Sequence, residues 1–335
     1  MSDGWHRVAV VGDGGWGTAL ARLLVLKGCE VVMWGAFPDY TAAMRQAGEN
    51  FKFLPGIPLP DGLRLTNDGT EALAGADVIV AAVPTQFLRR VLRRLVTCYR
   101  RPTPVVSVAK GIERRTLMRP TQIVRDVWGR VPVVALSGPS HAEEVARGLP
   151  TTVAVASSRR GLAERAQRLF MTDRFRVYTN ADIIGLELGG AVKNVIAIAA
   201  GICDGLGLGD NAKAALLTRG LAEMTRLGVA LGARRQTFAG LAGIGDLITT
   251  CMSPYGRNRA VGIQIGQGRS LREVLADMEQ VAEGVETTRS VRSLARRHGV
   301  EMPITEQCHR VLYRGKDPRR AVDALMRRAA RDEMG

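Results

Sequence analysis

A lysine and an asparagine lie next to each other, at Lys193 and Asn194, inside a stretch of small and apolar residues, 188–197. A lysine rarely lies in such surroundings without a partner. Its apolar stem could extend so that the amine reaches water. The alternative is an amine whose pKa is lowered, because burial and a nearby positive charge both disfavour the ammonium. Such a lysine could exchange a proton with a substrate near neutral pH.

A second lysine, Lys110, follows a short apolar run, 105–109, that predicts a buried strand. In open α/β sheets ligands bind at the carboxyl ends of the strands, so Lys110 is a candidate site residue, although a lysine on a solvated loop would give the same pattern. The segment 138–142 also follows a predicted strand, and its N–H groups could bind an anion where a helix begins. His141 in that segment could be a general acid, but we favour a histidine that simply begins the helix.

A third segment combines an acid with groups that carry several donors. Asp246 lies among apolar residues and glycines and is followed by two threonines. Arg257, Asn258 and Arg259 then offer planar groups that suit phosphate. An arginine cluster alone is usually surface charge, but an acid, two threonines and an Arg-Asn pair within thirteen residues favour a phosphate site.

A glycine pattern near the start of the chain predicts a dinucleotide site. Gly12, Gly14 and Gly17 form G-x-G-x-x-G directly after a predicted strand, 7–11, and before a predicted helix, 18–27. Gly12 permits the tight turn, Gly14 lets the backbone approach the pyrophosphate, and Gly17 lets the helix pack on the strand. The start of the helix then faces the phosphates with free N–H groups.

The end of the second predicted strand, 30–34, leaves the choice between NAD and NADP open. NAD enzymes usually place an acid there, and NADP enzymes often have an arginine nearby. This chain has Gly35, Ala36 and Phe37, and Asp39 comes only after a proline. The absence of an acid removes repulsion toward a 2′-phosphate but supplies no base, so we expect tolerance of NADP.

The elements that position these residues change in character near residue 180. Before it, strand patterns alternate with helical patterns, which predicts a parallel sheet with helices on both faces. After it only helical patterns occur. The sequence therefore predicts a Rossmann-type doubly wound domain, 1–180, and an all-helical domain, 181–335. The strand patterns lie at 7–11, 30–34, 77–83, 105–109, 131–136 and 152–156.

Composition excludes several classes of protein. The formal net charge is +15, but the arginines are scattered and not interleaved with aromatic residues, so we expect no nucleic-acid binding and a basic surface that attracts an anionic substrate. The five cysteines are far apart and form no CxxC, which indicates neither disulfides nor a metal site and favours the reducing cytoplasm. No signal peptide is visible, and the longest apolar run, 195–202, is too short to span a bilayer.

Taken together, these segments resemble the bacterial NAD(P)-dependent glycerol-3-phosphate dehydrogenases. The resemblance implies an oxidoreductase that interconverts dihydroxyacetone phosphate and sn-glycerol 3-phosphate with NAD or NADP, without a metal, as a cytoplasmic homodimer that serves glycerophospholipid synthesis. The longest similar block is 175–224. Shorter similar segments lie at 12–21, 53–60, 108–113, 137–151, 243–251, 257–259, 281–288 and 301–305.

The same resemblance implies roles for single residues. Lys193 corresponds to the residue that transfers the proton, Lys110 to a second active-site lysine that contacts cofactor and substrate, and Asn194 and Asp246 to the polar network around the reacting oxygen. Further substrate contacts are Gly138, Ser140, Gly256, Arg257 and Asn258, and further cofactor contacts are Gly15, Trp16, Ala142, Arg257, Val281 and Glu283.

Two positions depart from the resemblance. Many relatives carry His or Arg where this chain has Ala36, and many bacterial relatives carry Ser where this chain has Gly256. We expect altered affinity rather than lost activity from the second change, because a backbone N–H could replace the missing hydroxyl.

Other functions fit parts of the sequence. Another two-domain reductase, of the hydroxyacid or ketopantoate type, would share the architecture but would not need the Arg257-Asn258 pair. A non-catalytic NAD(P) sensor would keep the glycine turn but would need neither Lys110 nor Lys193.

Overall fold

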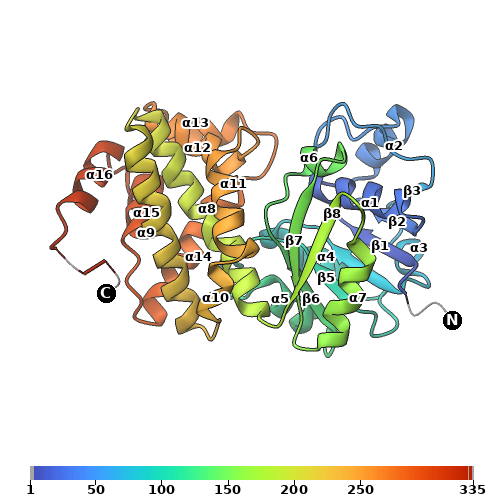
Figure 1. Cartoon of the computed structure of the whole chain (residues 1–335). Helices are drawn as coiled ribbons and strands as arrows, with labels where there is room; N and C mark the ends of the chain where they lie inside the picture. The colour runs from blue at the N-terminus through green and yellow to red at the C-terminus, as the bar shows by residue number, and fades with distance from the viewer. Residues whose placement is uncertain (1–3, 331, 334–335) are drawn as a thin grey trace.

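The N-terminal part of the chain is built on one eight-stranded sheet (Figure 1). A computed structural model describes residues 4–330, 332 and 333, so residues 1–3, 331, 334 and 335 of the predicted domain ranges lie outside it. The order across the sheet, β3-β2-β1-β4-β5-β6-β7-β8, is of the doubly wound Rossmann type, as predicted. The strands are β1 (Arg7–Val11), β2 (Glu30–Trp34), β3 (Leu63–Thr66), β4 (Val78–Ala81), β5 (Val105–Ser107), β6 (Val133–Ser137), β7 (Thr151–Ala156) and β8 (Phe175–Asn180).

Helices cover both faces of this sheet. In β1, Val8 and Val10 pack in one apolar cluster with residues of α1, while Ala9 and Val11 pack in another with residues of α4. Successive side chains of a strand point to opposite faces, so a strand buried on both faces must be apolar throughout. The helices of this part are α1 (Gly15–Leu26), α2 (Pro38–Ala47), α3 (Gly69–Leu73), α4 (Thr85–Arg94), α5 (Pro120–Trp128), α6 (Ala142–Ala146) and α7 (Arg160–Phe170).

One pair of neighbouring strands runs antiparallel, β6 with β7, whereas the other pairs are parallel. The prediction of a parallel sheet is therefore confirmed except at this pair. The connection contains only the short helix α6, which packs on α1. A parallel partner needs a crossover that returns the chain to the opposite edge of the sheet, and a strand that starts where β6 ends pairs antiparallel instead.

The strands at the two edges, β3 and β8, were not predicted. Both are partly exposed, and in β8 buried residues such as Phe175 and Val177 alternate with exposed Arg176 and Tyr178. Edge strands need fewer apolar residues than central strands, so the apolar-run criterion did not detect them.

The C-terminal part is helical, and α8 lies in its centre (Figure 1). Helices α9, α11, α12 and α14 pack around α8. The helices are α8 (Ile183–Gly205), α9 (Gly209–Ala230), α10 (Arg235–Phe238), a π-helical turn (Leu241–Gly245), α11 (Asp246–Met252), α12 (Arg257–Gly266), α13 (Leu271–Ala276), α14 (Glu283–Arg297), α15 (Pro303–Arg314) and α16 (Pro318–Met326).

Among the described residues, α8 is also the one helix long and apolar enough to cross a membrane by length and composition. The expectation of no membrane span rested on the apolar run 195–202, whereas these criteria are met by the whole of α8, Ile183–Gly205. Of its apolar window, 89% is buried inside the protein, and a core helix meets the same criteria. The burial therefore accounts for the composition of α8.

Candidate active site

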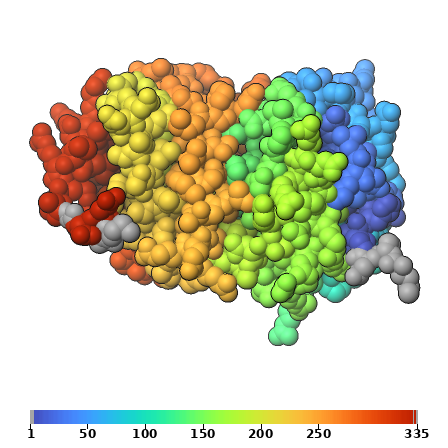
Figure 2. Space-filling model, viewed as in Figure 1, coloured from blue at the N-terminus to red at the C-terminus, as the bar shows by residue number. Residues whose placement is uncertain are grey.

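The predicted site residues come together in a cavity between the two parts of the chain. The cavity is bounded by the carboxyl ends of β1, β4, β5 and β6 and by residues of α8, α11, α12 and α14. Figure 2 shows the two parts in contact along a broad seam, with the orange residues near 250 against the green residues of the sheet part. The predicted residues that line the cavity are Gly14, Gly15, Trp16, Lys110, Ser140, Ala142, Lys193, Asn194, Asp246, Gly256, Arg257, Asn258, Val281 and Glu283.

Asp246 lies between the two lysines. Its Oδ2 accepts a hydrogen bond from Lys110 Nζ at 2.9 Å, and its Oδ1 accepts one from Lys193 Nζ. Asp246 and Lys193 are almost fully buried, with side chains 2% and 5% exposed. Burial alone would raise the pKa of Asp246, but the ammonium groups of Lys110 and Lys193 hold it below its ordinary value. The carboxylate is therefore ionised and neutralises part of the positive charge.

The pKa of Lys193 is lowered to about 8. Burial is the main cause, the positive charge of Lys110 adds to it, and Asp246 opposes both. Lys193 Nζ also donates to Thr250 Oγ1 at 2.6 Å. An amine with this pKa populates both its protonated and its neutral form near neutral pH, which is the property expected of a group that exchanges a proton with a substrate.

Lys110 is held across the end of the sheet by three contacts. Besides Asp246, its ammonium donates to Gly138 O at 2.8 Å and to Ser140 Oγ at 3.3 Å. Gly138 does not line the cavity, and its backbone has a φ of +139°, which a glycine adopts readily. Gly190 on α8 leaves room for Lys110, because a Cβ there would lie 3.3 Å from Lys110 Cγ.

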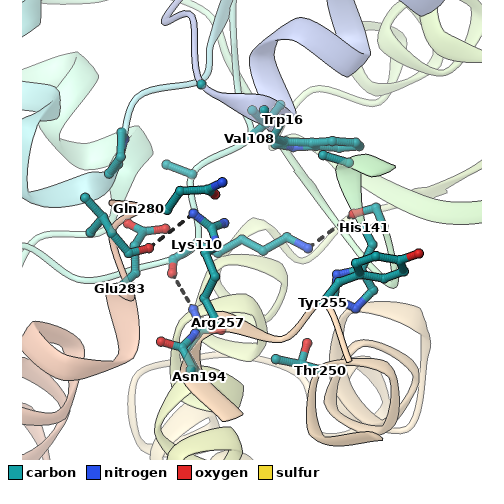
Figure 3. A pocket seen from close by; sticks show the side chains of 18 of the residues that line it. Trp16, Val108, Lys110, His141, Asn194, Thr250, Tyr255, Arg257, Gln280 and Glu283 are labelled. Atoms are coloured by element: carbon teal, nitrogen blue, oxygen red, sulfur yellow. Dashed lines mark hydrogen bonds between the residues drawn. The ribbon is translucent and has the colours of Figure 1, made fainter. Parts of the chain in front are cut away.

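Arg257 and Asn258 form the first turn of α12. Arg257 Nη1 donates to Val281 O at 3.2 Å, and Asn258 Oδ1 accepts from Gly284 N at 2.9 Å (Figure 3 shows Arg257). The start of a helix offers unpaired N–H groups and a partial positive charge. An arginine and an amide at such a start make this end of the cavity suitable for a phosphate.

Gly256 precedes that turn and is tightly packed. A Cβ at Gly256 would lie 2.8 Å from Thr250 O, which leaves no space for a larger residue without movement. Its N–H, which we expected to replace a missing hydroxyl, points at Ser253 O at 3.3 Å. Contact with an anion at this N–H would compete with that bond.

The glycine turn fits a dinucleotide pyrophosphate. A Cβ at Gly12 would lie 2.6 Å from Ala82 O, and one at Gly17 would lie 2.1 Å from Gly12 O, so both glycines are required by the packing of the chain itself. At Gly14 a Cβ would meet nothing within 4 Å. Gly14 lines the cavity at the start of α1, whose first turn contains no acidic residue. The open space is where a phosphate could approach the backbone.

Glu283 connects the two parts of the chain beside the cavity. It is the first residue of α14, and its Oε1 accepts from the backbone N–H of Thr85 at 2.7 Å, at the start of α4. It therefore lies next to Val83 and Pro84, which also line the cavity.

Thr250, Tyr255 and Gln280 are among the lining residues that were not singled out as site residues. Thr250 lies one helical turn after Asp246 and accepts a hydrogen bond from Lys193. The spacing of four residues on one helix could have indicated that Thr250 lies beside Asp246. Tyr255 lies beside His141, with ring centroids 5.8 Å apart, and Gln280 lies at the cavity edge (Figure 3). The contacts of Tyr255 and Gln280 join segments far apart in the sequence, so no local pattern marks them.

His141 is the N-cap residue directly before α6, which agrees with the interpretation favoured from the sequence. Burial and the positive charges of Lys193 and Lys110 lower its pKa to about 4. The imidazole is therefore neutral near neutral pH and is a poor general acid there. Within the described residues, no group of three or more His, Cys, Asp or Glu side chains could hold a metal ion.

Two family models match the chain. The N-terminal model of NAD-dependent glycerol-3-phosphate dehydrogenase matches residues 7–163, and the C-terminal model matches residues 182–323. A curated glycerol-3-phosphate dehydrogenase (NAD(P)+) from Geobacter sp. (strain M21) is 52% identical over 98% of this chain and 99% of the relative. The enzyme of the same description from Moorella thermoacetica is 52% identical over 98% of this chain and 97% of the relative.

Solved structures agree with these matches. The crystal structure of glycerol-3-phosphate dehydrogenase from Coxiella burnetii superposes with a TM-score of 0.93 at 40% identity, covering 97% of this chain and 99% of that chain. A ketopantoate reductase from Ralstonia eutropha, at 15% identity and a TM-score of 0.60, shares the fold alone, so the comparisons do not favour the alternative of a ketopantoate-type reductase. Because full-length relatives and both family models agree, the chain belongs to the NAD-dependent glycerol-3-phosphate dehydrogenase family.

Proposed function

We propose that this protein catalyses the reversible, NAD(P)-dependent conversion of dihydroxyacetone phosphate to sn-glycerol 3-phosphate. The observation that carries the proposal is the buried Lys193 ammonium, which shares the Asp246 carboxylate with Lys110. This cluster lies in one cavity with the glycine turn at the start of α1 and with the start of α12. The cavity thus combines a proton donor, a dinucleotide cradle and an anion site.

The glycine turn holds the cofactor in this proposal. Gly12, Gly14 and Gly17 let the pyrophosphate approach the start of α1, and Gly15, Trp16, Lys110, Ala142, Arg257, Val281 and Glu283 supply further contacts. When bound, the nicotinamide dinucleotide supplies a hydride to the substrate carbon, or accepts one in the reverse direction.

Lys193 supplies the proton in this mechanism. During reduction its ammonium donates a proton to the ketone oxygen at C2, which becomes the hydroxyl of sn-glycerol 3-phosphate, and the neutral amine then regains a proton from solvent. During oxidation the neutral amine accepts that proton. Lys110 stabilises negative charge as it develops on the oxygen, and Asp246 and Asn194 keep the two lysines in position.

The substrate phosphate is bound at the start of α12, by Arg257, Asn258 and the Gly256 backbone, with Gly138 and Ser140 completing the substrate contacts. The phosphate is remote from the carbon that reacts. Its binding energy can therefore position the ketone against Lys193.

We further propose that the protein acts in the cytoplasm as a homodimer and supplies sn-glycerol 3-phosphate to glycerophospholipid synthesis, with small molecules rather than nucleic acid as its ligands. All five cysteines are free thiols, which suits a reducing compartment. Twofold dimers are the commonest oligomers of soluble proteins.

The direct test follows nicotinamide absorbance with the purified protein, dihydroxyacetone phosphate, and NADH or NADPH in separate assays. We expect turnover with dihydroxyacetone phosphate and a far lower kcat/KM with dihydroxyacetone, the matched control that lacks the phosphate. Ketopantoate and simple 2-keto acids should give no turnover. Binding of nucleotide with no turnover of any of these substrates would favour the non-catalytic sensor instead.

A further inference from the structure

The carboxyl end of β2 is where dinucleotide-binding sheets contact the 2′ position of the adenosine ribose. The loop residues there, Gly35, Ala36 and Phe37, carry no charged side chain. Gly35 has no room for one, because a Cβ there would lie 2.5 Å from Thr41 Oγ1 and 2.6 Å from Asp13 Oδ2. A side chain that recognises the 2′ position of the ribose must therefore come from another segment.

Arg94, the last residue of α4, occupies this place. Its guanidinium lies over the Trp34 ring, 5.1 Å from the ring centroid, and its Nη1 donates to Ala36 O at 3.1 Å. The side chain is exposed, and no carboxylate pairs with it among residues 4–330, 332 and 333. The fold thus places the basic side chain of Arg94 at the end of β2, although the loop residues there include no base. Most of its N–H donors remain free.

A second arginine extends the positive charge toward the cavity. Phe87, Arg90 and Arg94 are spaced so that they share one side of α4, and the Arg90 guanidinium lies 5.5 Å from the centroid of the Phe87 ring. The N-terminal end of this row adjoins Val83 and Pro84, which line the cavity. The row therefore runs from the cavity to the end of β2, the path of the adenosine half of a dinucleotide bound at the glycine turn.

The acid that packs against Gly35 is buried rather than exposed at this surface. Asp13 lies in the glycine turn, its Oδ2 is buried, and burial raises its pKa above the ordinary value. Asp39 lies in the first turn of α2, beyond Pro38. The end of β2 therefore presents a guanidinium rather than a carboxylate.

We propose that Arg94, supported by Arg90, binds the 2′-phosphate of NADP(H), so that the enzyme uses NADPH in preference to NADH. The inference rests on the proposed dehydrogenase function. Guanidinium groups form paired, charge-assisted hydrogen bonds to phosphate, and NADH lacks the group that would receive them.

The first test compares kcat/KM for the two coenzymes in the wild type and in Arg94→Ala. Loss of charged hydrogen bonds should lower the value for NADPH by about tenfold or more and leave the value for NADH within about twofold. Arg93→Ala is the matched control, because Arg93 is the neighbouring exposed arginine on α4 and its loss changes the net charge equally. It should leave both values within about twofold.

A second variant adds repulsion at the same point. Ala36→Asp places a carboxylate beside the Arg94 guanidinium, where it competes with the phosphate. It should lower kcat/KM for NADPH and keep or raise the value for NADH. Retained activity with NADH shows that each variant has folded.

A binding test separates this inference from the dehydrogenase assignment, because it needs no substrate. Calorimetric titration with 2′,5′-ADP and with 5′-AMP should give about tenfold tighter binding of 2′,5′-ADP to the wild type, and Arg94→Ala should remove most of that difference. Equal binding of the two nucleotides, a wild-type preference for NADH, or an equal loss with both coenzymes in Arg94→Ala would each overturn the role of Arg94.

Discussion

The side-chain amide of Asn194 donates a hydrogen bond to the backbone carbonyl of Lys110 at 2.9 Å, which joins α8 to the segment that follows β5. Lys193 is the preceding residue of α8, so this bond fixes where the helix presents its ammonium relative to Lys110. Asp246 comes from α11 and accepts hydrogen bonds from both lysines. Two positive charges from different parts of the chain are thereby held close together, and one carboxylate offsets their repulsion.

Replacing Lys193 with alanine should lower kcat for dihydroxyacetone phosphate reduction by about 10²–10⁴-fold, the usual worth of a general acid. Coenzyme binding should survive, because the glycine turn lies on the sheet part of the chain. Steady-state kinetics and coenzyme titration by tryptophan fluorescence check the two statements separately. Lys213→Ala, outside the cavity, is the control, and turnover near the wild-type value in Lys193→Ala would refute the assignment.

The pH dependence should differ in sign between the two directions. In the proposed mechanism reduction needs the ammonium of Lys193, whose pKa is about 8, so its kcat/KM should be constant at low pH and fall as pH rises through about 8. Oxidation needs the neutral amine, so its kcat/KM should rise through the same range. His141, with a pKa of about 4, is neutral throughout and adds no step there. Profiles of the same slope in both directions would exclude Lys193 as the titrating group.

Asp246→Asn tests the shared carboxylate. Asp246 raises the pKa of Lys193, so its loss should move the descending limb of the reduction profile below about 8. The variant should also be less stable by about 3–5 kcal/mol, because two ammonium groups lose their buried partner. Asp277→Asn, which breaks an exposed pair with Arg269, is the control and should change neither the profile nor the melting temperature appreciably. An unchanged profile in Asp246→Asn would contradict the coupling.

Much of this arrangement could be predicted from the sequence. The glycine turn, the central strands and the Lys193 helix have strong local patterns, because strands buried on both faces are apolar throughout and Gly12 and Gly17 are required by backbone contacts. The edge strands β3 and β8 were not found, since partial exposure removes that pattern. The antiparallel β7 depends on where α6 packs, which no local pattern specifies.

Contacts between segments that are far apart in the sequence could not be predicted from local sequence patterns. Arg94 is one of several arginines in α4 and reaches Ala36 only because of how α4 packs on the sheet. Thr250 and Tyr255 enter the cavity through the packing of α11 and of the loop after it. The sequence directly after β2 contains no base, and it therefore did not predict the positive charge that Arg94 places at the end of β2.

Arg257→Ala should raise KM for dihydroxyacetone phosphate by about tenfold to a hundredfold, the range expected for lost hydrogen bonds to a charged group. A fall in kcat should accompany it, because phosphate binding also positions the ketone. Arg272→Ala removes an exposed arginine outside the cavity and should change neither constant. An unchanged KM for dihydroxyacetone phosphate in Arg257→Ala would show that the phosphate does not bind at the start of α12.

A buried carboxylate far from the cavity should set part of the pH dependence of stability. Glu223 on α9 accepts hydrogen bonds from Ile304 N and Thr305 N at the start of α15. Burial nevertheless raises its pKa to about 7, above the ordinary 4.5. The folded protein therefore binds a proton here more tightly than the unfolded chain, and the stability that this proton provides is lost as pH rises through about 7.

Glu223→Gln removes the titration and keeps an oxygen that can accept one of the two bonds. Relative to the wild type, the variant should gain in melting temperature as pH rises from about 5 to about 7 and then level off, whatever its stability at low pH. Glu164→Gln, which changes an exposed i,i+4 pair with Arg160, should show no such trend. A melting-temperature difference between Glu223→Gln and the wild type that stays flat from pH 5 to pH 8 would mean that Glu223 keeps an ordinary pKa and that the α15 N–H groups fully offset its burial.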